Sequence, residues 1–163
     1  MAPITLCPPA HDLRGVDPDL KPTIRLRDVV NFFSAAIKSA IRLRCLSLEQ
    51  VTRRVQRKKQ KHKKNSNILS SSTSTTNLSS NERLQELLQI FYLLRPLAYT
   101  AQNQCLYDAL VLLEFLSRYD IYPDWVFGVA MGPFSAHCWV QKGETVFNDS
   151  VAHTAFHTPI MVV

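Results

Sequence analysis

Apolar and polar residues follow a helical period in several stretches between residues 24 and 119. In residues 24–44, apolar positions recur every three or four residues with charged residues off that stripe, which predicts an amphipathic helix. The stripe consists of Leu26, Val29, Val30, Phe33, Ile37 and Ile41. We expect it to pack inside the domain, with a membrane surface or a partner protein as the alternatives. Ser47 with Gln50 resembles a capping box and predicts a second helix, whose apolar stripe ends after Val55.

Two further helices are predicted before the pattern changes. The third covers residues 82–95 and ends before Pro96, because proline has no backbone N–H to continue it. The fourth begins near Thr100 or Asn103, either of which can cap a helix, and continues through residues 105–119. Its predicted buried stripe consists of Leu106, Ala109, Leu110, Leu113 and Leu116.

From residue 125 onwards the apolar positions alternate with a period of two, which is typical of strands. Strands are predicted over residues 125–131, 134–141 and 145–147, with turns at Gly132-Pro133 and Lys142-Gly143. Residues 158–163 are a candidate fourth strand. Helices followed by antiparallel strands indicate an α+β fold, with N-terminal helices packed on a small antiparallel sheet.

Two parts of the chain show neither period. Residues 1–23 contain five prolines, which predicts an irregular lead-in. Residues 53–64 hold eight of the 19 Lys and Arg residues, and residues 65–81 are rich in Ser, Thr and Asn. Such compositions bury too little apolar surface to fold. We therefore predict one domain over residues 24–163, interrupted by a flexible segment at 53–81.

Composition indicates a soluble protein from a reducing compartment. With 163 residues, 46% of them apolar, the chain can bury one real core. The four cysteines, Cys7, Cys45, Cys105 and Cys138, show no disulfide or Cys-x-x-Cys spacing. The chain has no secretory signal and no run of the ~20 apolar residues that cross a bilayer. A cytoplasmic protein, at most peripheral to a membrane, is predicted.

The basic run and the histidines each raise a further question. The run at 53–64 has no interleaved aromatic residues to stack on bases, so nucleic acid is not an expected partner. His153 and His157 have helical spacing, but no helical stripe surrounds them, and Cys138 points to the opposite face of a strand from His137. We therefore predict no metal site and no cofactor.

Cys105 and His137 have the placement that thiol chemistry needs. Cys105 lies at or near the first turn of the fourth helix, where unpaired N–H groups stabilise a thiolate. His137, on the following sheet, can accept the thiol proton. A cysteine on an apolar helix is more often a buried core residue. The order along the chain, a cysteine opening a helix and then a histidine and an aspartate on successive strands, favours a site.

The residue that orients His137 depends on the register of the last hairpin. A two-residue turn at Lys142-Gly143 pairs His137 with Asn148, whereas a loop longer by one residue, or a bulge, pairs it with Asp149. Both alternatives are open from the residues alone.

Three segments carry a resemblance to a known family. They are NQCLYDALVLLEFL, FGVAMGPFSAHCWVQ and ETVFNDS, within residues 103–150. In these segments the chain resembles the B-type leader peptidases of lasso-peptide biosynthesis, a branch of the transglutaminase-like, papain-like cysteine peptidases. The resemblance covers roughly residues 24–163, and its specific motifs lie between Arg95 and Asp149.

The resemblance implies roles and partners. It makes Cys105 the nucleophile, His137 the general base and Asp149 its orienting partner, in a cysteine protease that cuts the leader from a ribosomally made precursor peptide. A separate ATP-dependent cyclase then closes the macrolactam on the freed amine. A separate leader-recognition protein is also implied, because only about 23 residues precede the first helix.

Backbone N–H groups at the helix start are expected to hold the oxyanion, with Gln104 and Gln102 as side-chain candidates. Two alternative functions stay open. One is an acyl or amide transferase with the same three residues, and the other is a non-catalytic module that presents peptides.

Overall fold

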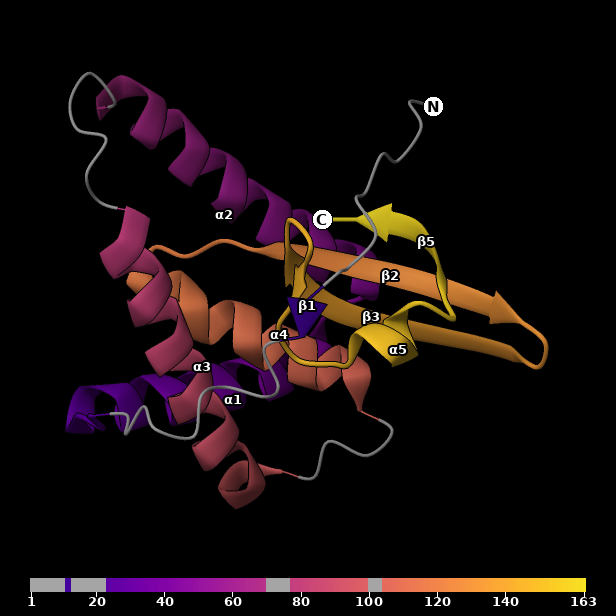
Figure 1. The fold of residues 1–163 in the computed structure, drawn as a ribbon, viewed down its shortest axis with the longest axis horizontal. Coiled ribbons are helices and arrows are strands. Elements are labelled where there is room, and N and C mark those ends of the chain that lie inside the picture. The colour runs from indigo at the N-terminus through magenta and orange to yellow at the C-terminus, as the bar shows by residue number, and fades with distance from the viewer. Residues whose placement is uncertain (1–10, 13–22, 70–76, 100–103) are drawn as a thin grey trace.

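The structure is a computed structural model that describes residues 11–12, 23–69, 77–99 and 104–163 (Figure 1). Its helices are α1 (Leu26–Cys45), α2 (Leu48–Leu69), α3 (Asn77–Ala98), α4 (Cys105–Leu116) and α5 (Val151–Thr154), with a short 3-10 turn η1 (Ser117–Tyr119). Its strands are β1 (His11–Asp12), β2 (Asp124–Met131), β3 (Phe134–Lys142), β4 (Thr145–Val146) and β5 (Thr158–Val162). Helices therefore precede the main strands, as the α+β prediction requires.

The sheet has the order β1-β4-β3-β2-β5. Strands β2, β3, β4 and β5 pair antiparallel, and the predicted strands are found within two residues of their expected bounds. β1 pairs parallel with β4, through His11 with Thr145 and Asp12 with Val146. The predicted irregular lead-in is therefore wrong at these two residues, while 1–10 and 13–22 lie outside the described residues.

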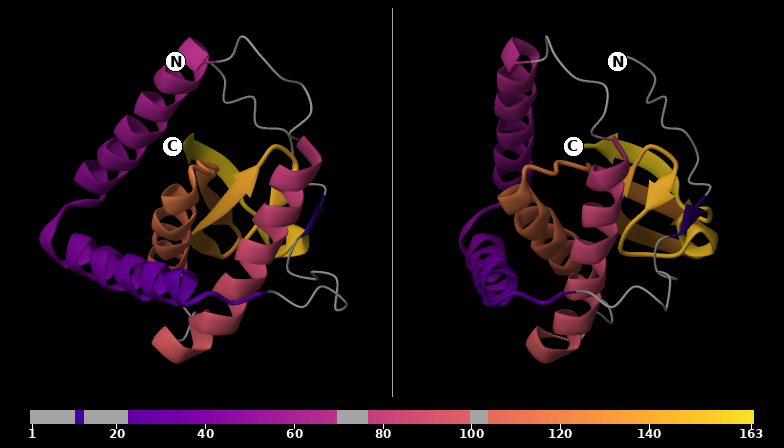
Figure 2. Two further views of the ribbon diagram at one scale, coloured as in Figure 1. Left: turned by 90° about the vertical axis from the view of Figure 1, so that its left-hand side faces the viewer. Right: turned by 60° about the vertical axis from the view of Figure 1, so that its left-hand side comes forward.

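Helix α4 is the centre of the molecule (Figure 2). All of its residues from Asp108 to Leu116 are buried, because apolar side chains surround the helix and a single stripe cannot account for them. It packs against α1 on one side and β3 on the other, and α1 also contacts α3. Its core partners include Phe32, Phe91, Leu87, Trp125 and Val140. The nucleophile candidate Cys105 is thus the first residue of the best-enclosed helix.

The face that α1 buries differs from the predicted one. Its buried residues are Asp28, Phe32, Ala35, Ala36 and Ser39. Five residues of the predicted stripe face solvent, from 37% exposed for Phe33 to 79% for Leu26. The small side chains of Ala35 and Ala36 let α1 approach α4 closely, so that Tyr107 donates a hydrogen bond to the Ala36 carbonyl oxygen (2.9 Å). The expectation that the stripe packs inside the domain is wrong for these five residues.

Most of the segment predicted to be flexible is helical. Residues 53–69 continue α2 and residues 77–81 open α3, so the prediction for 53–81 is wrong there, and 70–76 lie outside the described residues. Long-range ion pairs explain the helix that composition did not favour. Lys58 Nζ lies 3.2 Å from Glu114 Oε2, and Lys59 pairs with Asp124.

Two helix ends also differ from the prediction. Helix α3 contains Pro96 and continues to Ala98, where Tyr99 N still bonds the Arg95 carbonyl oxygen (3.1 Å). Helix α4 begins at Cys105 with Gln104 as its N-cap residue, and the predicted caps Thr100 and Asn103 lie outside the described residues. Among the described residues, none of the helices combines the length and the apolar character needed to cross a bilayer.

Candidate active site

Cys105 opens onto a surface cavity of about 480 Å³. The cavity is also lined by His137, Asp149, Asn148, Asp108, Arg95, His153 and His157. Cys105 is half-buried and belongs to the rim of the main hydrophobic core. Its side chain is therefore fixed by packing on one side and accessible to a substrate on the other.

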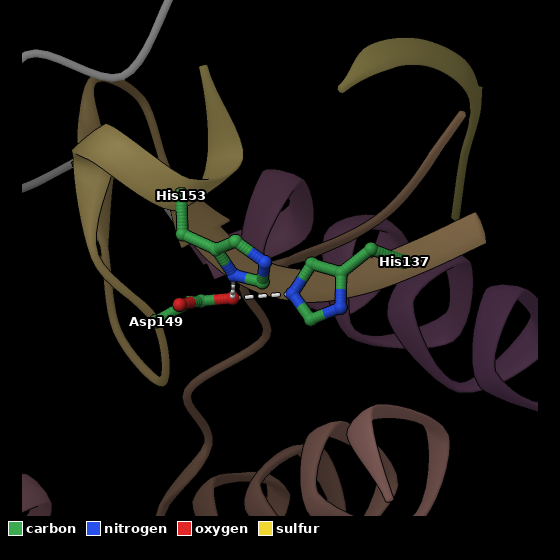
Figure 3. Close-up of side chains that lie close together, drawn as sticks. All are labelled: His137, Asp149 and His153. Carbon is green, nitrogen blue, oxygen red and sulfur yellow. Dashed lines mark hydrogen bonds and ion pairs between the residues drawn. The ribbon is translucent and has the colours of Figure 1, made fainter. Parts of the chain in front are cut away.

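His137 faces the same cavity from β3. Its Nε2 hydrogen-bonds Asp149 Oδ2 (Figure 3). Because Asp149 takes Nε2, Nδ1 is the nitrogen left to interact with Cys105, which is close enough to raise the pKa of His137. The ring stacks on Trp139, two residues along the same face of the strand, with centroids 6.1 Å apart. His137 therefore lies between the thiol and the carboxylate.

The charges of this group favour an ion pair of thiolate and imidazolium. Burial alone lowers the pKa of His137, but its hydrogen bonds with Asp149 and Cys105 outweigh burial and raise that pKa to about 9. Burial likewise raises the pKa of Asp149, and hydrogen bonds from His137 and His153 outweigh it, giving a pKa of about 2. The carboxylate is therefore ionised above a pH of about 2, and the imidazolium persists up to about 9, so the two charges coexist between these values.

Cys138 is a contact that sequence reasoning missed. The pKa of Cys105 is lowered to about 4, although burial opposes this shift. The largest cause is a hydrogen bond from the Cys138 thiol, and the next is a hydrogen bond from His137. The hydrogen bond between the two thiols, together with burial, raises the pKa of Cys138 far above its ordinary value. Cys138 does occupy the strand face opposite His137, as predicted, but Cys105 at the helix end is in contact with both.

Asp149 reaches His137 because the ladder between β3 and the following segment breaks. Lys142 pairs with Thr145 and Gln141 with Val146, so the turn is Gly143-Glu144, and neither predicted register is correct. Gly143 has φ +58°, which suits glycine in this turn. Continued pairing would have put Asp149 opposite Cys138, on the wrong face for His137. The chain instead bends at residues 147–149 and turns the carboxylate to the imidazole.

Asn148 causes the break, since its side chain replaces a backbone partner. Its Oδ1 accepts a hydrogen bond from Val140 N (2.8 Å), and its Nδ2 donates to Asp108 Oδ2 (3.0 Å). Asn148 was the alternative orienting residue for His137, and in the structure it contacts Asp108 instead.

Asp108 connects the site to α3. Its Oδ1 lies 3.1 Å from Arg95 Nε and accepts a hydrogen bond from the Tyr99 hydroxyl (2.9 Å). Burial raises the pKa of Asp108 despite these partners. Because Asp108 lies one turn after Cys105, this network fixes α4, α3 and the Asp149 loop relative to one another.

Two histidines after Asp149 belong to the site and were not predicted to. Residues 151–154 form one helical turn, α5, capped by Ser150 Oγ accepting from His153 N (3.1 Å). This turn carries His153 Nδ1 to 2.9 Å from Asp149 Oδ2. The sequence shows no helical stripe around these histidines, yet the structure has this single helical turn. The serine at position 150, three residues before His153, could have predicted this helical turn, because serine is a strong N-cap residue.

His157 contacts the backbone of His153 and the side chain of Ser135 through its two ring nitrogens. Its Nδ1 lies 3.1 Å from the His153 carbonyl oxygen, which can only accept, so Nδ1 carries the proton and Nε2 (3.2 Å from Ser135 Oγ) accepts from the hydroxyl. Gly128 on β2 pairs with His137 on β3, and because glycine has no side chain it leaves room for His157. A Cβ at Gly128 would stand 2.9 Å from the His157 Cβ and 3.0 Å from the Trp139 ring.

The two glutamines predicted near the oxyanion have different outcomes. Gln104 is exposed immediately before Cys105, and its side chain makes no capping hydrogen bond. Its amide is thus compatible with a donor role. Gln102 lies outside the described residues.

Comparison with known proteins agrees with this geometry at the level of the family. A family model described as the transglutaminase-like superfamily matches residues 46–162. That span contains α2, α3, α4 and the four antiparallel strands, together with every residue discussed at the site. No curated protein and no solved structure showed a significant match to the chain. The match covers well over half of the chain, which therefore belongs to the transglutaminase-like superfamily.

Proposed function

We propose that this protein is a cysteine peptidase in which Cys105 is the nucleophile, His137 the general base and acid, and Asp149 the residue that orients His137. The observation that carries the proposal is the arrangement of these residues around one cavity, with His137 hydrogen-bonded to Asp149 and close enough to Cys105 for each to shift the pKa of the other. A superfamily that includes cysteine peptidases and transferases supports the same chemistry.

The proposed reaction proceeds through a thioester. The Cys105 thiolate attacks the scissile carbonyl carbon, and the carbonyl oxygen becomes an oxyanion held by backbone N–H groups at the start of α4, with Gln104 as an additional donor. As the C–N bond breaks, the His137 imidazolium gives its proton to the leaving amine. Neutral His137 then takes a proton from water, whose oxygen attacks the thioester. Cleavage of the C–S bond releases the acid and restores the thiolate and the imidazolium.

The proposed substrate is the precursor of a lasso peptide, from which the enzyme removes the leader. The motifs around Cys105, His137 and Asp149 resemble those of leader peptidases that do this. A separate recognition protein is proposed to deliver the leader, and an ATP-dependent cyclase to use the freed amine.

Hydrolysis is favoured over acyl transfer by the open rim of the cavity. Ser135, Ala136 and His153 are exposed there, so water can reach a thioester at Cys105. A transferase would need that water excluded. Adding an amine in excess of the precursor and weighing the products separates the two reactions, because transfer gives a leader that is heavier than the hydrolysed leader by the mass of the amine minus that of one water.

Mass spectrometry of the precursor tests the proposal. Incubated with the recognition protein and the cyclase, the wild-type protein is expected to release the leader, and Cys105→Ala to lower the rate by about 10⁴-fold or more. Cys45→Ala is the matched control, because Cys45 is an exposed thiol on α1 outside the cavity. Cleavage by Cys105→Ala at the wild-type rate would refute the assignment. An intact precursor with the wild-type protein would refute the peptidase function.

A further inference from the structure

A carboxylate and two imidazoles converge beside the proposed nucleophile. His137, Asp149 and His153 each direct one metal-ligating atom toward the others, and these atoms all lie within 4.8 Å of one another (Figure 3). Asp149 Oδ2 is common to both histidines, bonding His137 Nε2 and His153 Nδ1. Nitrogen and carboxylate oxygen are ligands that zinc prefers.

One pair of these ligand atoms needs only a small adjustment to fit a tetrahedral ion. With bonds of about 2.1 Å, two ligand atoms of tetrahedral zinc stand about 3.4 Å apart. His153 Nδ1 and Asp149 Oδ2 are 2.9 Å apart, so that pair needs to separate by only about half an ångström. His153 is 52% exposed and sits on a four-residue helix at the surface, so its side chain has room to move.

The groups around the ligands hold them in an orientation that favours a metal. Ser150 N donates to Asp149 Oδ1 (2.7 Å), which leaves Oδ2 directed at the two imidazoles. His157 bonds the His153 carbonyl oxygen and Ser135, so both of its nitrogens are engaged outside the cluster. Hydrogen bonds of this kind commonly fix metal ligands in proteins.

We propose that His137, Asp149 and His153 form a reversible site for Zn²⁺, and that zinc bound there switches the proposed peptidase off. Three protein ligands leave the fourth position of the ion for water, on the exposed side of His153. Cys105 is not a proposed ligand, because the group of converging ligand atoms consists of His137, Asp149 and His153. The inhibitory part rests on the proposed function, whereas the binding part does not.

Inhibition follows from the nitrogen that the ion takes. Zinc on Nε2 uses the lone pair of that nitrogen, so the neutral ring must carry its proton on Nδ1. The zinc-bound ring is a neutral imidazole and a far weaker acid than the imidazolium of the resting ion pair, so it does not protonate the leaving amine. Nδ1 also has no lone pair with which to accept the proton of water later. The ion also occupies the Asp149 oxygen that would stabilise an imidazolium.

Metal binding is tested first, without reference to activity. Co²⁺ is titrated into Cys105→Ala, and its visible absorption is followed as Zn²⁺ displaces it. Cys105→Ala is expected to keep the site, with no sulfur-to-cobalt charge-transfer band. Adding His153→Gln to that variant should weaken binding by on the order of 100-fold. His62→Gln, which removes a histidine that stacks on Tyr122 outside the cavity, should leave binding unchanged.

Several outcomes would overturn the site. They are loss of binding in Cys105→Ala, unchanged binding in the added His153→Gln variant, or equal losses in the His153 and His62 variants. Thermal unfolding of each apo variant is measured alongside. His153→Asn serves as the second variant if His153→Gln unfolds early.

Inhibition is tested on precursor cleavage, with each variant compared with its own metal-free rate. Zinc is expected to stop the wild-type protein, a chelator to restore it, and His153→Gln to need on the order of 100-fold more zinc. Acceleration by zinc, or the same midpoint in both proteins, would overturn the inhibitory proposal. If the wild-type protein cleaves no precursor at all, the proposed function fails while the cobalt titration still decides the metal site.

Discussion

At the scale of single residues, the carboxylate of Asp149 does more than orient one imidazole. It accepts hydrogen bonds from His137, His153 and the Ser150 amide. These bonds outweigh burial and keep its pKa near 2, so the negative charge persists over the whole range in which the Cys105 and His137 ion pair exists. A fixed negative charge beside His137 favours the imidazolium, and the imidazolium in turn favours the thiolate.

The pH dependence of the thiolate and of cleavage follows from these shifts. Alkylation of Cys105 by iodoacetamide should rise as pH passes about 4, where the thiolate forms. kcat/KM should rise there too and fall as pH passes about 9, where His137 loses the proton needed by the leaving amine. Asp149→Asn removes contacts that raise the pKa of His137, so the alkaline limb should move to lower pH and the rate fall by up to about 10⁴-fold.

Asp120→Asn is the matched control for that profile. It removes one carboxylate at a left-handed position, φ 59°, which asparagine also tolerates. Its pH profile should match that of the wild-type protein. An alkaline limb that stays in place in Asp149→Asn would contradict the role given to Asp149.

Cys138→Ala tests the contact that was not foreseen. Without the Cys138 thiol, the pKa of Cys105 should rise while His137 still holds it below that of an ordinary cysteine. The midpoint of the alkylation profile should therefore move to higher pH. Loss of one buried sulfur should cost about 1 kcal/mol of unfolding free energy, measured by urea denaturation. An unmoved midpoint would mean that His137 alone lowers the pKa of Cys105.

At the scale of helices and strands, α1 shows that a pattern can predict an element and still give the wrong buried face. Both sides of α1 carry apolar residues, and the stripe with the larger side chains faces solvent. The face with Ala35 and Ala36 is buried because α4 needs a close neighbour, with Phe32 filling the space between Phe91 and Phe115. That choice depends on a partner far along the chain, which local periodicity does not contain.

A pair of truncations distinguishes the two faces of α1. Phe32→Ala should lower the free energy of unfolding by about 3–5 kcal/mol, because it empties a fully buried site. Ile37→Ala, on the exposed stripe, should change it by less than about 0.5 kcal/mol. Urea denaturation measures both. A larger loss for Ile37→Ala than for Phe32→Ala would mean that α1 is rotated from the orientation described.

The strands could be predicted well because their signals are local. Alternation over residues 125–141 and glycine at the turns define the β2–β3 hairpin without reference to the rest of the chain. The order Cys105, His137, Asp149 along the chain likewise pointed to three of the residues that line the cavity, whereas Arg95, Asp108, His153 and His157 were not predicted to lie there. The register that brings Asp149 there was not predictable, because Asn148 breaks the ladder through bonds to Val140 and Asp108, and Asp108 is 40 residues away.

At the scale of the whole molecule, one buried carboxylate joins three helices. Glu114, on α4, is 3% exposed and pairs with Lys38 and Arg42 of α1 and Lys58 of α2. Burial raises its pKa, but these three cations outweigh burial and lower it. This is where part of the basic run of residues 53–64 finds its counter-charge, and it explains why a segment with that composition is helical.

Glu114→Gln should therefore lower the free energy of unfolding by about 1–3 kcal/mol. This figure already allows for screening of the ion pairs by water, because Lys38 and Lys58 are partly exposed. Glu49→Gln breaks an exposed pair with Arg53 and should cost less than about 0.5 kcal/mol. Because the folded pKa of Glu114 is lowered, its contribution is present above the unfolded pKa and lost as pH falls through the folded one. The free energy of unfolding, measured at several acidic pH values, should fall less steeply with pH in Glu114→Gln than in the wild-type protein. Equal losses of this free energy in Glu114→Gln and Glu49→Gln would refute the role given to Glu114.

The enclosure of α4 has a consequence for how the protein opens. Every side chain from Asp108 to Leu116 is covered, by α1 on one side and β3 on the other. The amide hydrogens of that stretch can meet deuterated solvent only when those layers separate together, so their exchange should report the unfolding of the entire domain. Cys105 lies one turn before this stretch on the same helix, so we expect the full cooperativity of the fold to hold it in place.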